Sequence, residues 1–258
     1  MKFIGREIPI TRVFSAGFIF FRLLPRLSIV KHPLTILKYY IQRNSPENIE
    51  LKGDKKISFS THPHDIMTFF GIFLKKDYGD IKPDSIVIDI GANIGVFSLY
   101  AALSGAKKVY SFEPSKEAFQ ILCKNIELNN LKDVIIPFNK AVSSVDDLTI
   151  KFPVSSSPYN KIDNKIDDDE DYLEVKTISL KSICDENNIQ TIGLLKLDCE
   201  GAEFDILPNI DELSLAKIEE VKMEYHVDPK ELIIFLEKKG YKISVRKERS
   251  ILFAKKIA

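Results

Sequence analysis

The spacing of hydrophobic and polar positions changes near residue 80 and divides the chain into two parts. Residues 1–50 are predicted to form short helices interrupted by prolines. A hairpin around Lys52-Gly53-Asp54 and a helix at about 65–75 follow. After that, short apolar runs alternate with amphipathic stretches, which is typical of strands and helices in an α/β domain. We therefore assign residues 1–60 to a helical N-terminal extension with a hairpin, and residues 61–258 to the main domain.

The main domain is predicted to be a doubly wound, mostly parallel sheet. Its first part reads strand, helix, strand, helix, strand, an order that gives right-handed crossovers between parallel strands. A capped helix begins at Asp228, ends near Gly240 and precedes an antiparallel C-terminal hairpin. The predicted strands cover residues 85–90, 108–112, 134–138, 148–154, 174–180, 193–198, 218–225, 241–245 and 250–255. The other predicted helices cover 94–104, 115–129, 181–188 and 203–207.

Composition excludes several classes of protein. The 258 residues carry a formal net charge of zero, so no overall basic excess indicates nucleic-acid binding. Three scattered cysteines do not form a disulfide framework, which favours a reduced, cytoplasmic setting. The longest apolar stretch, 13–21, is shorter than the roughly 20 residues that cross a bilayer, and no secretory signal is expected.

The N-terminal region is locally basic, and two interpretations remain open. Its helices either pack on the main domain with solvated basic side chains, or rest on anionic lipid as an interfacial amphipathic segment. The second interpretation predicts peripheral membrane contact through residues 10–45. The basic residues concerned are Lys2, Arg6, Arg12, Arg22, Arg26, Lys31, Lys38 and Arg43.

A glycine-containing turn after the first buried strand predicts a cofactor site. A dinucleotide fingerprint requires three glycines, but Asn93 and Val96 occupy the second and third positions, which argues against pyrophosphate. Asp89 at the strand tip and Glu113 at the end of the next strand suit a cationic ligand with a ribose diol, namely S-adenosylmethionine. Asn139 either meets the adenine edge or caps a turn. The expected cofactor-binding residues are Asp89, Gly91, Ala92, Asn93, Gly95, Glu113 and Asn139.

Three motifs resemble the FkbM family of methyltransferases. They are Val87–Leu99, Val109–Pro114 and Leu195–Glu203, and the resemblance extends over roughly residues 65–255. The family resemblance implies a Rossmann-like fold with a seven-stranded sheet and an activity that methylates hydroxyl oxygens, mostly on macrolide or sugar substrates. The carried-over residues of the third motif are Lys196, Asp198, Glu200, Gly201 and Glu203, and a segment Glu224-Tyr225-His226 is also similar to the family pattern.

The expected chemistry is methyl transfer from S-adenosylmethionine to a hydroxyl group of a small-molecule or carbohydrate acceptor. The catalytic candidates are Asp198, His226 and Glu200, which follow neighbouring strands. Asp198 or His226 would take the acceptor's proton, and Glu200 or Glu203 would orient the acceptor. Asp198 could instead bind the cofactor's ammonium, His226 could be a packed histidine, and Glu203 could serve the helix dipole.

No catalytic metal is expected, because no close-spaced pair of ligands is present. The segment His62-Pro63-His64-Asp65 is expected to be a loop near the mouth of the pocket, and Lys196, set among core leucines, is expected to pair with a carboxylate. Three other functions are considered: a nucleotide-dependent oxidoreductase on a similar sheet, a non-catalytic protein that keeps the cofactor fold as a scaffold, and a nucleic-acid methyltransferase. The absence of an Asn-Pro-Pro-aromatic segment and of a basic, aromatic-rich face argues against the third.

Overall fold

The core of the protein is a seven-stranded sheet with the order β13-β14-β12-β11-β5-β6-β7. The computed structural model describes residues 2–3, 6–7, 21, 23–60, 62–153, 172–199 and 201–257. The five strands β12, β11, β5, β6 and β7 are all parallel to one another. The strand β14 is antiparallel to both β12 and β13. This confirms the predicted sheet and its antiparallel hairpin. The strands are β5 (Ile86–Ile90), β6 (Lys108–Phe112), β7 (Ile135–Phe138), β11 (Leu194–Leu197), β12 (Glu220–Glu224), β13 (Tyr241–Arg246) and β14 (Ile251–Lys256).

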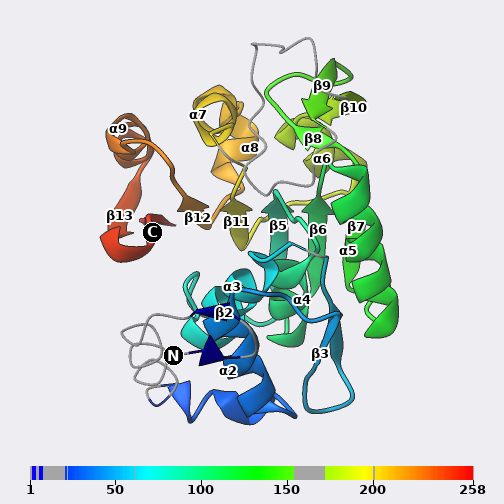
Figure 1. Ribbon diagram of the computed structural model, residues 1–258. Coiled ribbons are helices and arrows are strands. Elements are labelled where there is room, and N and C mark those ends of the chain that lie inside the picture. Colours follow the sequence, from blue (N-terminus) through cyan, green and yellow to red (C-terminus); the bar gives the residue numbers. More distant parts are fainter. Residues whose placement is uncertain are drawn as a thin grey trace.

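Helices cover both faces of the sheet (Figure 1). Because side chains alternate along a strand, Val87 of β5 enters one hydrophobic cluster and Ile88 enters the other. The first cluster contains residues of α4 (Val96–Leu103) and α5 (Lys116–Leu128). The second contains residues of the helices on the opposite face, which are α6 (Leu180–Glu186), α7 (Glu203–Ile206), α8 (Glu212–Ala216) and α9 (Lys230–Lys238).

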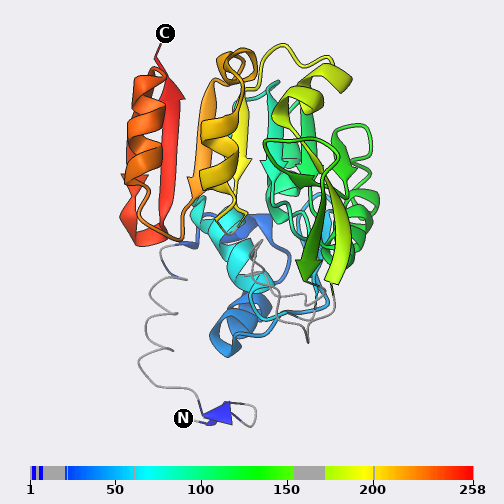
Figure 2. The same cartoon turned by 90° about the horizontal axis from the view of Figure 1, so that it is seen from above.

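A smaller three-stranded sheet with the order β8-β10-β9 lies beside the main one, as seen in Figure 2. Its strands are β8 (Ala141–Val142), β9 (Thr149–Pro153) and β10 (Tyr172–Ile178). The sequence predicted β9 and β10 but neither β8 nor α8. The strand β8 has two residues and the helix α8 has five. Segments of this length are too short to show a hydrophobic period, so the sequence contains no recognisable pattern for them. The acidic run 167–171 lies outside the described residues.

The described part of the N-terminal region is less helical than predicted. Its described part contains α2 (Pro33–Gln42) and a 3-10 turn, but β1 (Lys2–Phe3) and β2 (Arg6–Glu7) form an antiparallel pair. The helical prediction is therefore wrong for these residues, whose strands are again too short for a recognisable period. The predicted hairpin is confirmed as β3 (Asn48–Glu50) and β4 (Lys56–Ser58), and the predicted helix as α3 (Asp65–Phe69) with its π-helical continuation Phe70–Lys75.

The hairpin is bonded to the main domain through the side chain of Asn125. Its Oδ1 accepts the Ser58 N–H at 2.6 Å, and its Nδ2 donates to the Ser58 carbonyl at 2.9 Å. The same Nδ2 donates to the carbonyl of Ile94, in the turn after β5, at 2.8 Å. Leu27 and Ile57 belong to the same hydrophobic cluster as the helix α4. The hydrophobic core therefore continues across the predicted boundary at residue 60.

Large apolar side chains are exposed in the N-terminal region. Phe21 is 71% exposed and Leu34 is 74% exposed. Among the described residues, no helix has both the length and the apolar character needed to cross a bilayer. Residues 10–20 lie outside the described part, and membrane contact through residues 10–45 stays a prediction.

Candidate active site

A cavity of about 600 Å³ lies at the carboxyl ends of the central strands. This is the edge at which doubly wound sheets bind ligands. Its wall includes the turn after β5, the turn after β6, the start of β8 and the segment that joins β4 to α3. The predicted site residues in this wall are Gly91, Ala92, Asn93, Glu113, Asp198 and His226. Glu200 lies outside the described residues.

Two glycines shape the turn after β5 for different reasons. Gly91 has φ +73°, and a Cβ atom there would lie 1.9 Å from the carbonyl oxygen of Asp198. Only glycine allows this close approach between the turns that follow β5 and β11. Gly95 has φ +86°, and a Cβ atom would lie 2.4 Å from Cδ1 of Leu122 in α5. Gly95 does not line the cavity and instead permits the packing of α4 on α5.

Glu113 follows β6 and lines the cavity, and backbone N–H groups hold both of its carboxylate oxygens in place. Oε2 accepts the N–H of Asn93 at 2.7 Å, and Oε1 accepts the N–H of Ser115 at 2.8 Å. Asn93 adopts φ +50°, a left-handed conformation that asparagine tolerates well. Burial raises the pKa of the Glu113 carboxyl from 4.5 to about 7, against the lowering effect of the two backbone N–H groups. Each oxygen keeps a second lone pair that can accept a ligand hydroxyl.

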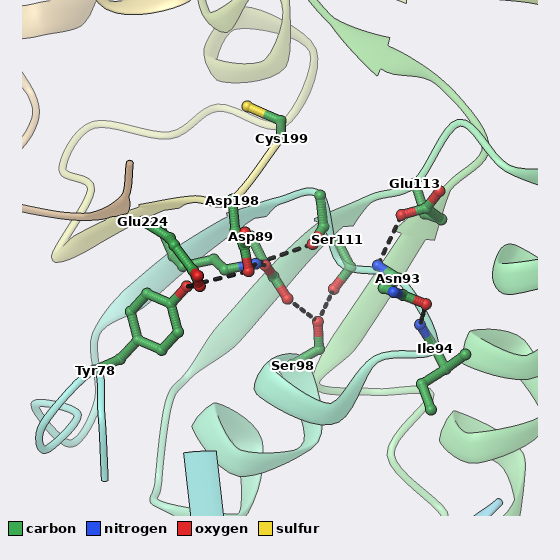
Figure 3. A network of polar contacts seen from close by, with 12 residues as sticks. Tyr78, Asp89, Asn93, Ile94, Ser98, Ser111, Glu113, Asp198, Cys199 and Glu224 are labelled. Carbon is green, nitrogen blue, oxygen red and sulfur yellow. Dashed lines mark hydrogen bonds and ion pairs between the residues drawn. The ribbon is translucent and has the colours of Figure 1, made fainter. Parts of the chain in front are cut away.

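Asp89 lies beneath the cavity rather than in its wall. It is fully buried and stands opposite Lys196 in the register of β5 and β11. The Lys196 Nζ lies 3.0 Å from Asp89 Oδ1 and donates to the Gly91 carbonyl at 2.9 Å. The Ser98 hydroxyl donates to Asp89 Oδ2 at 2.6 Å (Figure 3). The predicted pairing of Lys196 with a carboxylate is thus confirmed. Because the same ammonium bonds to the Gly91 carbonyl, the pair supports the cofactor turn, Gly91–Gly95, from below.

The charge on Lys196 is maintained by its neighbours. Burial alone would lower the pKa of the ammonium, but the carboxylates of Asp89 and Asp198 outweigh burial and hold that pKa above its ordinary value. The ammonium therefore stays charged near neutral pH, although only 3% of the side chain is exposed.

Two further predicted residues hold turns in place. Asn139 Nδ2 donates to the carbonyls of Glu113 at 2.8 Å and Pro114 at 3.0 Å, so it fixes the turn after β6 and does not line the cavity. Of the two roles considered for Asn139, the structure shows the turn. Glu203 is fully buried and accepts the N–H groups of Cys199 and Gly201 at 2.7 and 2.8 Å. It therefore orders the loop after β11 instead of facing an acceptor.

Asp198 and His226 are brought together through two residues that the sequence analysis did not assign to the site. The Tyr78 hydroxyl lies 3.1 Å from Asp198 Oδ2 and 3.3 Å from Glu224 Oε2. Glu224 Oε1 lies 3.9 Å from His226 Nε2. Asp198, Glu224 and His226 line the cavity. Tyr78 precedes β5 and is separated from Asp198 by 120 residues, so no local motif could reveal it.

The segment His62-Pro63-His64-Asp65 borders the cavity, as predicted for a loop near its mouth. The two imidazole rings stack with centroids 5.1 Å apart. Asp65 Oδ2 accepts both the N–H and the hydroxyl of Ser60 at 2.7 Å, which braces the loop internally. Within the part of the chain that the structure describes, no group of three histidine, cysteine or acidic side chains is arranged to hold a metal ion.

Comparison with known proteins identifies the family. Residues 89–243 match the profile of the methyltransferase FkbM domain, which is more than half of the chain. The chain belongs to the FkbM family of methyltransferases. The FkbM match includes the cofactor turn, Glu113, Asp198 and His226, but neither Tyr78 nor the histidine-containing loop. Membership of a methyltransferase family sets aside the oxidoreductase alternative.

Individual methyltransferases are similar over more than half of the chain. "Methyltransferase 1" of Beauveria bassiana is 27% identical over 204 residues, 68% of this chain and 80% of the relative. The hexuronic acid methyltransferase AglP of Haloferax volcanii is 26% identical over 158 residues, 59% of this chain and 62% of the relative. The 31-O-demethyl-FK506 methyltransferase FkbM of Streptomyces tacrolimicus is 25% identical over 206 residues, 68% of this chain and 78% of the relative.

A solved structure shares the fold. The crystal structure of the FkbM methyltransferase from Methylobacillus flagellatus KT superposes with a TM-score of 0.51 at 14% identity. The superposition covers 95% of this chain and 60% of that one. The Rossmann-like methyltransferase fold expected from the sequence is therefore confirmed.

Proposed function

We propose that the protein transfers a methyl group from S-adenosylmethionine to a hydroxyl oxygen of a small-molecule or carbohydrate acceptor. The observation that carries this proposal is the Glu113 carboxylate, which lines the cavity and is held by the N–H groups of Asn93 and Ser115. A carboxylate fixed at the end of the second parallel strand accepts the two ribose hydroxyls of a nucleoside. The cavity volume of about 600 Å³ lies within the range of pockets for ligands of this size.

The charges around the cavity favour a cofactor without phosphate. Asp198 and Glu224 present carboxylates at the ends of β11 and β12, where the cationic part of S-adenosylmethionine would lie. A pyrophosphate in the same place would face like charges. The turn Gly91–Gly95 also lacks the glycine spacing that admits a pyrophosphate.

The acceptor is proposed to be polyhydroxylated. Two relatives are named for a hexuronic acid and for 31-O-demethyl-FK506, both consistent with methylation of a hydroxyl. The segment that leads from β4 into α3 borders the cavity with polar side chains that can bind hydroxyl groups, namely Ser60, His62, His64 and Thr68. This loop would form the acceptor side of the site.

His226 is the proposed general base. Its side chain is 26% exposed and lines the cavity, with Nε2 3.9 Å from the Glu224 carboxylate. Histidine exchanges protons near neutral pH, and an adjacent carboxylate orients the ring. Asp198 has its Oδ2 in contact with Tyr78 and Lys196, which suits it to a fixed charge more than to proton transfer.

Replacing His226 by alanine is expected to lower the turnover number by about 100-fold or more while leaving the affinity for the methyl donor unchanged. The loss arises because the acceptor hydroxyl keeps its proton. Turnover measured with labelled donor and donor affinity measured by calorimetry separate the two effects. His32→Ala, which changes an exposed histidine at the start of α2, is the matched control. Full turnover of His226→Ala would assign the base elsewhere.

Donor affinity is expected to decrease as the pH falls below 7. The folded-state pKa of Glu113 is about 7 because the side chain is buried, so the carboxylate is mostly ionised at pH 8 and mostly protonated at pH 6. Protonation removes an acceptor for the ribose hydroxyls, and the expected loss between these two values is up to about tenfold. The charge of Lys196 lowers the pKa of Glu113, and the charge of Asp89 raises it. Titration calorimetry of wild type and Glu113→Gln at both pH values tests this, since the variant should lack that part of the pH dependence.

The proposed activity is tested by incubating the protein with methyl-labelled S-adenosylmethionine and a panel of sugars, uronic acids and polyhydroxylated macrolides. Label recovered in a methyl ether, the product of hydroxyl methylation, supports the proposal. Label transferred to carboxyl, nitrogen or carbon acceptors alone would contradict it. Calorimetry showing that neither S-adenosylmethionine nor S-adenosylhomocysteine binds would remove its basis.

A further inference from the structure

A buried tyrosine outside the FkbM-matched segment connects two acidic side chains of the cavity. Tyr78 is 4% exposed, and its ring packs edge-on against Phe97, with centroids 5.2 Å apart. Its hydroxyl lies within hydrogen-bond distance of both Asp198 and Glu224, and its one proton can be donated to either. Figure 3 shows this hydroxyl pointing at the two carboxylates. Tyr78 is thus the link between the ends of β11 and β12.

The bridge holds two like charges close together. Asp198 Oδ2 and Glu224 Oε2 both contact the same hydroxyl oxygen, so the two carboxylates are neighbours in the cavity wall. Like charges at this range repel, and a hydrogen-bond donor between them offsets part of that repulsion. Burial, followed by the charges of Asp198 and Glu224, raises the pKa of the Tyr78 hydroxyl well above its ordinary value. The hydroxyl therefore remains a donor across the neutral pH range.

The buried ammonium of Lys196 is shared between Asp89 and Asp198. The Lys196 ammonium lies 3.0 Å from Asp89 Oδ1, where it also bonds to the Gly91 carbonyl, and 3.6 Å from Asp198 Oδ2. One ammonium thus faces the carboxylates of Asp89, Asp198 and, beyond Tyr78, Glu224. By formal charge, these four side chains, one lysine and three acids, carry a net charge of −2 (+1 − 3).

The position of the pair relative to Glu113 matches the layout of the donor. Along the sheet, β11 lies two strands from β6, on the other side of β5. Neighbouring strands are about 4.8 Å apart, so the strand ends that carry Glu113 and Asp198 are about 10 Å apart. A nucleoside whose ribose is bound by Glu113 would direct its 5′ substituent, which carries the sulfur, across the turn of β5 toward β11.

We propose that Tyr78 is a positioning residue whose hydroxyl holds the Asp198 and Glu224 carboxylates side by side, and that this pair favours the cationic sulfonium of the methyl donor over the uncharged thioether of the demethylated product. This inference rests on the proposed function. The transfer breaks the sulfur–methyl bond and forms a bond between the methyl carbon and the acceptor oxygen, whose proton passes to the proposed base His226. The electron pair of the broken bond stays on sulfur, so the positive charge disappears there. The attraction to the carboxylate pair ends with it, which assists release of the product.

The test compares the affinities for S-adenosylmethionine and S-adenosylhomocysteine by calorimetry. The two compounds share the ribose and the ammonium and differ in the methyl group and charge on sulfur, so the ratio of their dissociation constants reports on the sulfonium. Wild type should favour S-adenosylmethionine. In Tyr78→Phe this preference should fall by about fivefold, while the affinity for S-adenosylhomocysteine changes less than about twofold. A loss of general stability would weaken both ligands alike.

Tyr100→Phe is the matched control. Tyr100 is also buried, contacts the same Phe97 ring and donates its hydroxyl to a backbone carbonyl, that of Gly79, at 3.0 Å. It should keep the wild-type preference. If Tyr78→Phe does not fold, Glu224→Gln removes one charge of the pair at a half-exposed position and should lower the preference as well.

An unchanged preference in whichever of these two variants folds would overturn the role of the pair, as would a wild type without preference for the charged donor. These results differ from failure of the proposed function, in which wild type binds neither compound.

Discussion

Lys196→Met is expected to lower the free energy of unfolding by about 3–5 kcal/mol, because it leaves the Asp89 carboxylate buried without its ion pair. Asp89 is fully buried, and the Lys196 Nζ lies 3.0 Å from its Oδ1. Methionine fills a similar volume, so the loss reports on charge rather than on packing. Urea-induced unfolding followed by circular dichroism measures the effect.

Two controls separate the buried pair from lysine replacement in general. Lys82→Met breaks the ion pair with Glu219, whose two side chains are 70% and 46% exposed, and should change stability by less than about 1 kcal/mol. Combining Lys196→Met with Asp89→Asn should recover part of the stability, since no unpaired buried charge remains. If Lys196→Met alone were as stable as Lys82→Met, Asp89 and Lys196 would not form the electrostatic support of the cofactor turn.

Glu113→Ala is expected to weaken binding of S-adenosylmethionine by about 100-fold or more. Two ribose hydroxyls lose a charged acceptor, and each such hydrogen bond contributes about 1.5–3 kcal/mol. The N–H groups of Asn93 and Ser115 lose their acceptor as well, which loosens the turn. Calorimetry at pH 8, where the wild-type carboxylate is mostly ionised, gives the largest difference.

The matched control for this prediction is Glu117→Ala. Glu117 also lines the cavity but lies exposed in the first turn of α5, and its removal should change donor affinity less than about threefold. Equal losses in the two variants would show that the cavity attracts the donor through its overall charge and not through a specific bond to Glu113.

The sequence predicted those parts of the fold that are encoded locally. The turn Gly91–Gly95 follows from the glycine pattern after one predicted strand, and the position of Glu113 follows from an acidic residue at the end of the next. Gly91 and Glu113 both line the cavity. The helix ending near Gly240 was readable because glycine stops a helix where φ is positive, and Gly240 has φ +84°.

The sequence could not predict which charged residues face the cavity. Asp89 lies near the carboxyl end of its strand, where an acidic residue can bind a ligand. The pairing of β5 with β11 places Asp89 opposite Lys196 instead, and there its side chain is buried beneath the turn. Asp89 and Lys196 are 107 residues apart (196 − 89), so their pairing leaves no local pattern in the sequence. Tyr78 was missed for a similar reason, since its contacts with Asp198 and Glu224 exist only after β5, β11 and β12 have assembled.

The bonds of Asn125 bear on which piece of the chain can be regarded as a minimal unit. The segment recognised as the methyltransferase domain, 89–243, contains Asn125 and Ile94 but ends short of β14 and excludes Ser58. A fragment cut at those limits would lose both bonds between the Asn125 amide and Ser58, and it would lose Tyr78. It would also lose the first three residues of the central strand β5, which begins at Ile86. The matched segment is therefore shorter than the hydrophobic core that surrounds it, because Ile57 of the hairpin belongs to the same cluster as residues of α4 and α5.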